Sequence, residues 1–136
     1  MTDYNVTITK TVSRADIENI CITALEGGIG YWAQLDNTNA DFLAAKEKHA
    51  GQTTSIVFAR GLMDGIPMTF IDATGEVNET WTMTIDDLLS GISQYYAGVD
   101  KKGHVLEHHA LHFDDWDIDH ADFVFQLGIF GEEVFG

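Results

Sequence analysis

Two capped segments with apolar side chains at helical spacing constrain this chain more than any other feature. Ser13 with Asp16, and Thr84 with Asp87, are capping pairs in the acidic variant, in which a hydroxyl and a carboxylate satisfy free amides at the start of a helix. The apolar side chains that follow recur every three to four residues, so each segment predicts an amphipathic helix. These side chains are Ile17, Ile20, Cys21, Ala24 and Leu25 in the first segment and Ile85, Leu88, Leu89, Ile92, Tyr95 and Tyr96 in the second.

Short segments of β-forming residues, separated by turn signals, predict the sheet. Asp64-Gly65 and Thr74-Gly75 are turn dipeptides, and their positions favour an antiparallel meander. The expected strands are Asn5–Val12, Ser55–Ala59, Met68–Asp72 and Val77–Met83, and Ile29–Leu35 is expected to be a strand or an extended loop.

Three further helical segments complete the pattern. Thr38–Ala50 is weakly helical, and His104–Phe113 has the spacing of a short helix. Asp119 with Asp122 predicts the cap of a last helix, and its apolar residues Phe123 to Phe130 require burial across the sheet. We therefore expect a single α+β domain over residues 1–136, with a small antiparallel sheet of about four strands and three to four helices packed mainly on one face.

Acidity limits the partners of this chain. It has 22 acidic and seven basic residues, for a formal charge of −15, and after residue 60 there are 15 acids against only Lys101 and Lys102. Nucleic acid and anionic membrane both need positive charge on the protein, so we expect neither as a direct partner. The acidity has two interpretations. It serves solubility, or it forms a carboxylate face that imitates a phosphate backbone and occupies a nucleic-acid-binding protein.

The chain shows no sign of export, membrane insertion or nucleophilic catalysis. It has no apolar run of 18 residues and no basic region followed by an apolar stretch at its start, so a cytoplasmic location is expected. The single cysteine, Cys21, lies on the apolar side of a predicted helix and is expected to be a buried, reduced thiol. No serine has the setting of a nucleophile elbow, which favours a non-enzymatic protein.

Glycine-aromatic motifs at both ends of the chain resemble a known family. Residues 24–28 read ALEGG and precede Tyr31-Trp32, residues 88–92 read LLSGI, and the end of the chain carries FGE at 130–132 and FG at 135–136. In this order the sequence resembles a family of small bacteriophage and prophage proteins of uncharacterised function. The resemblance implies a phage accessory protein in the cytoplasm of a bacterial host, with host defence as a target. The histidine-rich segment 103–112 and the shortage of basic residues depart from that family.

The first motif supplies the candidate ligand-binding residues. Its glycines follow a helix, whereas phosphate-binding glycines precede one, so a helix C-cap is the simpler interpretation. The functional alternative is a ligand-lining turn with aromatic stacking, a polar anchor and an arginine that meets a phosphate. Its members are Glu26, Gly28, Tyr31, Trp32 and Arg60.

Histidines supply the candidate metal site. His104, His108 and His112 are spaced by four residues and would share one face of a helix, with nearby aspartates to complete a zinc shell. A solvated surface is the alternative interpretation, because the glutamate of the HExxH pattern is missing. A calcium loop at 115–126 fails, since His120 replaces the required glycine and Gln126 the closing glutamate.

Three functional hypotheses follow from the sequence. The first is a non-enzymatic phage accessory protein that inhibits a basic host protein through its acidic surface. The second is sequestration of a small nucleotide signal, and the third is metal binding or metal-dependent catalysis by the histidine segment. The aromatic content is compatible with a homodimer.

Overall fold

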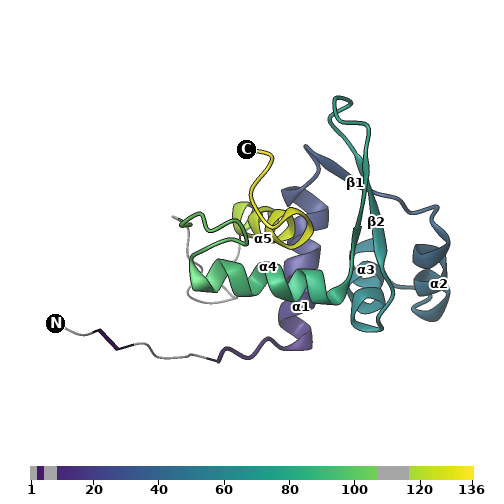
Figure 1. Ribbon diagram of the computed structural model, residues 1–136. Coiled ribbons are helices and arrows are strands. Elements are labelled where there is room, and N and C mark those ends of the chain that lie inside the picture. Colours follow the sequence, from purple (N-terminus) through teal and green to yellow (C-terminus); the bar gives the residue numbers. More distant parts are fainter. Residues whose placement is uncertain (1–2, 5–8, 107–116) are drawn as a thin grey trace.

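The computed structural model describes residues 3–4, 9–106 and 117–136, and it confirms the α+β class (Figure 1). The elements in chain order are α1 (Arg14–Thr23), a π-helical turn η1 (Ala24–Gly28), β1 (Ala33–Leu35), α2 (Ala40–Lys48), α3 (Thr54–Met63), β2 (Met68–Asp72), β3 (Thr80–Met83), α4 (Ile85–Ala97) and α5 (Ile118–Phe130). Within these residues no helix combines the length and the apolar character needed to cross a membrane.

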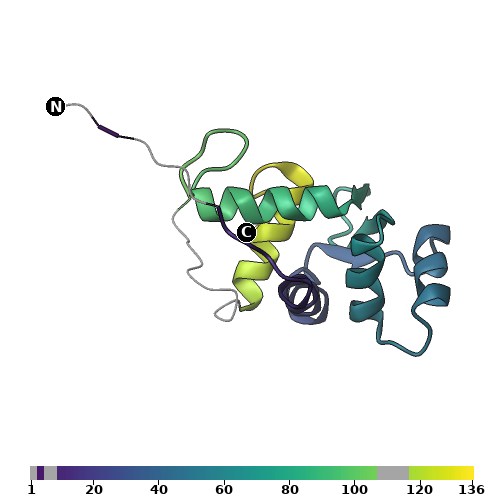
Figure 2. The same cartoon turned by 90° about the horizontal axis from the view of Figure 1, so that it is seen from below.

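Both capping boxes predicted from sequence are present. The Ser13 hydroxyl accepts from the Asp16 amide at 3.1 Å, and the Thr84 hydroxyl accepts from the Asp87 amide at 3.2 Å. Gly98 ends α4 in the left-handed conformation, with φ of 75°. Helix α1 lies between the pair α4–α5 and the pair α2–α3, and Figure 2 shows α1 nearly end-on in that place.

The sheet is antiparallel, in the order β1-β2-β3, and one of its faces is buried. Because directly paired residues share a face, the register sorts the side chains of the strands into two sets. The inner set is Ala33, Leu35, Met68, Phe70, Asp72, Trp81 and Met83, and the outer set is Gln34, Thr69, Ile71, Thr80 and Thr82. The outer set is polar apart from Ile71, which is 39% exposed, so the helices lie on the inner side.

The strand predicted at Ser55–Ala59 is wrong, because these residues lie in helix α3. A short apolar run fits a buried strand and a buried helix equally well, so tertiary contacts decide which of the two forms. In the helix Phe58 and Leu62 are both 0% exposed, and α3 packs against α1, α2 and β2. The described residues therefore form three strands, where the sequence predicted about four.

Other predicted boundaries shift by a few residues. The strand β2 and the helix at 38–50 are confirmed, while β3 starts at Thr80 instead of Val77. Helix α5 starts two residues earlier than predicted, because Asp117 and not Asp119 is its N-cap and pairs with His120. Of the predicted strand at 5–12, residues 5–8 lie outside the described residues and residues 9–12 have no regular structure.

The predicted helix at 104–113 falls mostly outside the described residues. Residues 107–113 are not described, and the first three residues are not helical. Val105 instead forms an isolated antiparallel bridge with Val99, and the Leu106 amide donates to the Gly98 carbonyl at 2.8 Å. A short loop back onto the end of α4 replaces the start of the predicted helix.

Glycines let α5 approach its neighbours at backbone distance. A Cβ added at Gly91 of α4 would lie 2.3 Å from the Val124 carbonyl oxygen, and one at Gly128 would lie 2.5 Å from the Asp87 carbonyl oxygen. On the other side of α5, a Cβ at Gly28 would lie 3.0 Å from the Ile118 carbonyl oxygen. Backbone atoms cannot swing away as a side chain can, so these positions exclude larger residues.

We expect Gly91→Ala to lower the free energy of unfolding by about 1–3 kcal/mol, because its methyl group would push α4 away from α5. Gly30→Ala is the matched control, since a Cβ there meets nothing within 4 Å. Its effect should stay within about 0.5 kcal/mol. Urea unfolding of both variants measures the difference, and equal effects would contradict the close crossing.

Candidate functional site

A buried carboxylate, Asp122 of α5, binds the turn that follows η1. It is 9% exposed. Its Oδ1 accepts from the Trp32 indole N–H at 2.7 Å and from the Gln126 side-chain amide at 3.0 Å, and its Oδ2 accepts from the Tyr31 hydroxyl at 2.5 Å. Three donors therefore satisfy a charge that would be costly to bury alone.

Gln126, one turn after Asp122, fastens the C-terminal segment to the same network. Its Oε1 accepts from the backbone amides of Val134 and Phe135 at 2.8 and 2.7 Å, and its amide donates to the Phe135 carbonyl at 2.9 Å. The Tyr31 hydroxyl lies 3.2 Å from that same carbonyl. The last residues of the chain thus lie against the turn that follows η1.

The family-like motifs meet around this network. The Trp32 ring stacks on Phe135 with centroids 5.2 Å apart and an interplanar angle of 8°, and it also contacts Trp81 and Phe130. Trp32 is 0% exposed, so its face is not free to stack on a ligand. Packing and hydrogen bonding account for the YW pair and for the FG end of the chain.

Tyr31 differs from Trp32 because its ring reaches the surface and is 52% exposed. Partial burial of its hydroxyl, the hydrogen bond to Asp122 and the negative charges of Asp122 and Glu133 raise the pKa of Tyr31 above its ordinary value. The hydroxyl therefore stays protonated and keeps donating to the carboxylate.

An acidic cleft of about 300 Å³ opens beside Tyr31. Four carboxylates line it, together with three aromatic rings, and neither lysine nor arginine is among the lining residues. His120 lies 3.4 Å from Asp117, which it pairs with in the cap of α5. The lining residues are Tyr31, Asp117, Asp119, His120, Asp122, Phe123, Glu133, Phe135 and Gly136.

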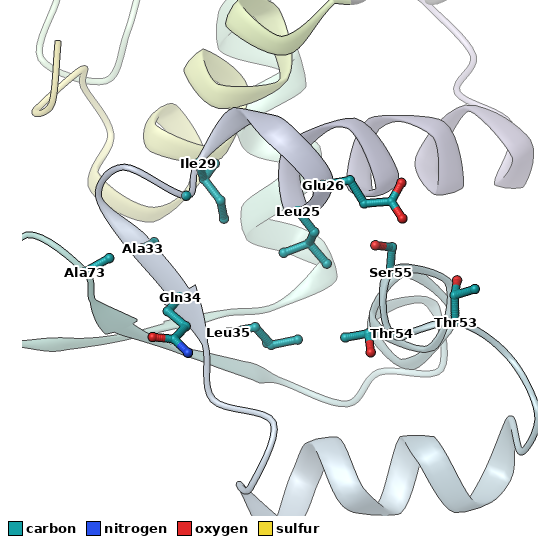
Figure 3. A pocket seen from close by; sticks show the side chains of 11 residues that line it. Leu25, Glu26, Ile29, Ala33, Gln34, Leu35, Thr53, Thr54, Ser55 and Ala73 are labelled. Atoms are coloured by element: carbon teal, nitrogen blue, oxygen red, sulfur yellow. The ribbon is translucent and has the colours of Figure 1, made fainter.

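A second cavity, of about 590 Å³, lies between η1, β1 and the start of α3 (Figure 3). We call it the edge cavity because β1 is an edge strand of the sheet. Its polar groups are those of Glu26, Gln34 and residues 53–55, and its apolar lining comes from Leu25, Ile29, Ala33, Leu35 and Ala73.

The structure does not gather the five predicted ligand residues into one place. Tyr31 lines the acidic cleft, Trp32 lies in the core, and Gly28 packs on the α5 backbone. Glu26 lines the edge cavity instead. Arg60 lines neither cavity, and its guanidinium pairs with Glu18 of α1 at 2.8 Å.

The sequence did not identify the two residues that organise this region, Asp122 and Gln126. The sequence pattern indicates a helix cap or a metal ligand for Asp122, and for Gln126 a place in the C-terminal family motif and a failed calcium ligand. One signal points to both of them, because a carboxylate and an amide one turn apart interrupt an otherwise apolar helix. Polar groups in such a place need partners, and the sequence does not say which.

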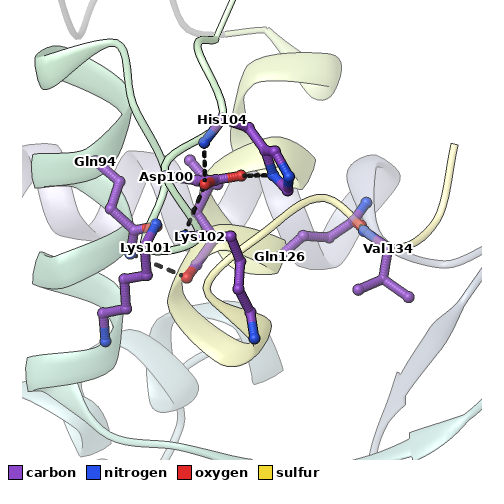
Figure 4. A network of polar contacts seen from close by, with 8 residues as sticks. Gln94, Asp100, Lys101, Lys102, His104, Gln126 and Val134 are labelled. Atoms are coloured by element: carbon purple, nitrogen blue, oxygen red, sulfur yellow. Dashed lines mark hydrogen bonds and ion pairs between the residues drawn. The ribbon is translucent and has the colours of Figure 1, made fainter.

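Of the predicted metal ligands, only His104 belongs to the described residues. Its Nδ1 lies 2.9 Å from Asp100, whose carboxylate also accepts from the backbone amides of Lys102 and His104 (Figure 4). Burial opposes ionisation, but these hydrogen bonds prevail and lower the pKa of Asp100. No three His, Cys, Asp or Glu side chains in the described ranges form a group that could hold a metal ion. His108 and His112 lie outside those ranges, and the zinc site stays a prediction.

We expect Asp122→Ala to lower the free energy of unfolding by about 2–3 kcal/mol, because it leaves the buried Trp32 N–H without an acceptor. Asp122→Asn keeps an acceptor there and should cost less. Asp119→Ala, at an exposed site on the same helix, is the control and should cost less than about 1 kcal/mol. Chemical unfolding of the three variants tests this order, and a cost for Asp122→Ala no larger than that of the control would contradict it.

Cys21 is 0% exposed, as predicted, and burial with a smaller contribution from Glu18 raises the pKa of its thiol. We expect the native protein not to react with a thiol-specific dye on the timescale on which the unfolded protein reacts fully. Dye titration with and without denaturant measures this, and rapid reaction of the native protein would contradict a closed core at α1.

Comparison with known proteins gives no relative for this chain. No family model matches it, and no curated protein and no solved structure matches it either. A function for this protein therefore has to be argued from its own residues.

Proposed function

We propose that this protein is a non-enzymatic binding protein whose acidic cleft receives the cationic side chains of a basic partner protein. The observation that carries the proposal is the lining of the cleft, which has four carboxylates and aromatic rings but no lysine or arginine. A lysine or arginine from outside would supply the missing positive charge.

The cleft suits a long cationic side chain in shape and chemistry. Asp119 and Glu133 are exposed at its rim, and neither forms a salt bridge within the described residues. Phe123 and Phe135 offer apolar surface to the methylene stem, and ring faces attract a guanidinium. Asp122 has its own internal donors, so it contributes charge without needing a new hydrogen bond.

A bare metal ion fits the cleft less well than an organic cation. Metal ions require several ligands that converge within short distances, and no such group of three forms among the described side chains. A guanidinium is planar and spreads its charge over several donors, so it can bridge carboxylates that lie further apart.

The net charge extends this argument to the class of partner. A chain at −15 attracts proteins with basic surfaces over a distance of about 10 Å at 0.1 M salt, and nucleic-acid-binding proteins carry such surfaces. The resemblance to phage proteins suggests a host protein in the bacterial cytoplasm, with a component of host defence as the preferred candidate. In that setting the protein would compete with nucleic acid for the partner's basic groove.

The charge-neutral double variant Asp119→Asn with Glu133→Gln tests the cleft. Glu47→Gln with Glu76→Gln is the matched control, because both of its sites are exposed and it changes the net charge equally. We expect binding of a hexa-arginine peptide to weaken by about tenfold in the cleft variant and by less than about twofold in the control. Titration at low and at physiological salt measures both, and an equal loss in the two variants would mean that only the total charge matters.

Capture from bacterial lysate identifies the partner. The native protein should retain a basic host protein at physiological salt, the cleft variant should lose it, and added DNA should compete for it. Recovery of no host protein at low or physiological salt would count against the proposal.

A further inference from the structure

The edge cavity presents hydrogen-bonding groups that no described residue uses. The bonds between β1 and β2 run from residues 32, 34 and 36, since the Trp32 carbonyl accepts from Ala73 and the Asp36 amide donates to Thr69. In an antiparallel strand the backbone N–H and C=O groups of the intervening residues are directed to the opposite edge of the strand. The carbonyl of Ala33 and both backbone groups of Leu35 therefore face the free edge, where the cavity lies.

The start of helix α3 lies across the cavity from β1 (Figure 3), and no described side chain caps its free amides. Its N-cap residue Thr53 makes no side-chain capping bond, and the first turn contains no acidic residue. The amides of that first turn are left as donors, with the positive end of the helix dipole behind them. A carboxylate is the group that such an end favours.

Ser55 adds a second, independent observation at the same place. The residue is 5% exposed, and its hydroxyl has no hydrogen-bond partner among the described residues. Figure 3 shows this hydroxyl directed from the end of α3 towards the η1 segment that carries Leu25 and Glu26. Because this hydroxyl lines the cavity and makes no hydrogen bond within the described part of the chain, it can donate to or accept from a bound ligand.

Glu26 adds a negative group to the lining of the cavity, which also contains the positive N-terminal end of α3. It is exposed and is the only carboxylate among the lining residues. Glu26 would repel a simple anion. A ligand with both a carboxylate and an ammonium could bind the first-turn amides of α3 and the Glu26 carboxylate at the same time. The free β1 carbonyls add acceptors for the ammonium, and Leu25, Ile29 and Leu35 offer apolar contact.

We propose that the edge cavity binds a free α-amino acid with an apolar side chain. Its carboxylate accepts from the first-turn amides of α3 and from the Ser55 hydroxyl, its ammonium pairs with Glu26, and its side chain lies on Leu25, Ile29 and Leu35. The cavity of about 590 Å³ is within the usual size of small-ligand sites. The edge cavity and the acidic cleft share no described lining residue, so this proposal does not depend on the function proposed above.

L-Leucine and three analogues test the chemistry in the full-length protein. We expect millimolar L-leucine to raise the thermal midpoint, because a ligand that binds only the folded state stabilises it. Leucinamide lacks the carboxylate, while N-acetyl-leucine and isocaproate lack the ammonium, and each should give a much smaller rise. No rise with leucine, or an equal rise with isocaproate, would overturn the proposal.

Two variants and a control test the residues. Ser55→Ala and Glu26→Gln should each weaken leucine binding by about tenfold in calorimetric titration. Glu26→Gln should at the same time improve isocaproate binding, because it removes a repelling charge, and simple misfolding cannot produce that reversal. Glu76→Gln, on the exposed β2–β3 turn, should leave both affinities unchanged. Unchanged leucine affinity in Ser55→Ala and Glu26→Gln would also overturn the proposal.

Discussion

The buried carboxylate of Asp122 fixes the turn after η1 to helix α5, and the C-terminal segment joins them through Gln126. The carboxylate of Asp122 receives donors from Tyr31 and Trp32, which follow η1, and from Gln126 of its own helix. Gln126 in turn binds the backbone of the last residues. A carboxylate in a protein interior is stable only when its lone pairs are filled, so the turn after η1 and the C-terminal segment have to be in place together.

Close helix packing makes this arrangement possible. Gly91 and Gly128 bring α4 and α5 to backbone contact, and Gly28 does the same between η1 and α5. Bulkier residues would hold α5 away from both neighbours, and the hydrogen bonds to Asp122 at 2.5–3.0 Å would be lost with small displacements. Helix α5 sets the geometry of the acidic cleft, because Asp119 and Phe123 lie on the same turns of α5 as Asp122.

The two cavities differ in the kind of recognition that they favour. The acidic cleft has excess negative charge and aromatic rims, which favours the cationic side chain of a protein partner. The lining of the edge cavity contains both a helix N-terminus and a carboxylate, which favours a small zwitterion. Neither proposal calls for a catalytic group. Cys21 is buried in the core, and burial together with Asp122 raises the pKa of Tyr31, so its hydroxyl keeps its proton.

Local chemistry in the sequence determined the starts of α1 and α4 and the turns around β2, because each depends on residues within a few positions of one another. The apolar spacing of α1 indicated that the Cys21 thiol is buried, and packing of α1 against α3 and α5 buries it. Tertiary structure decided that residues 55–59 form a helix, since their short apolar run fits either state until α1, α2 and β2 surround it. It also decided the roles of Asp122 and Gln126. Asp122 finds its partners 90 and 91 residues away, and no local pattern encodes a contact across such a separation.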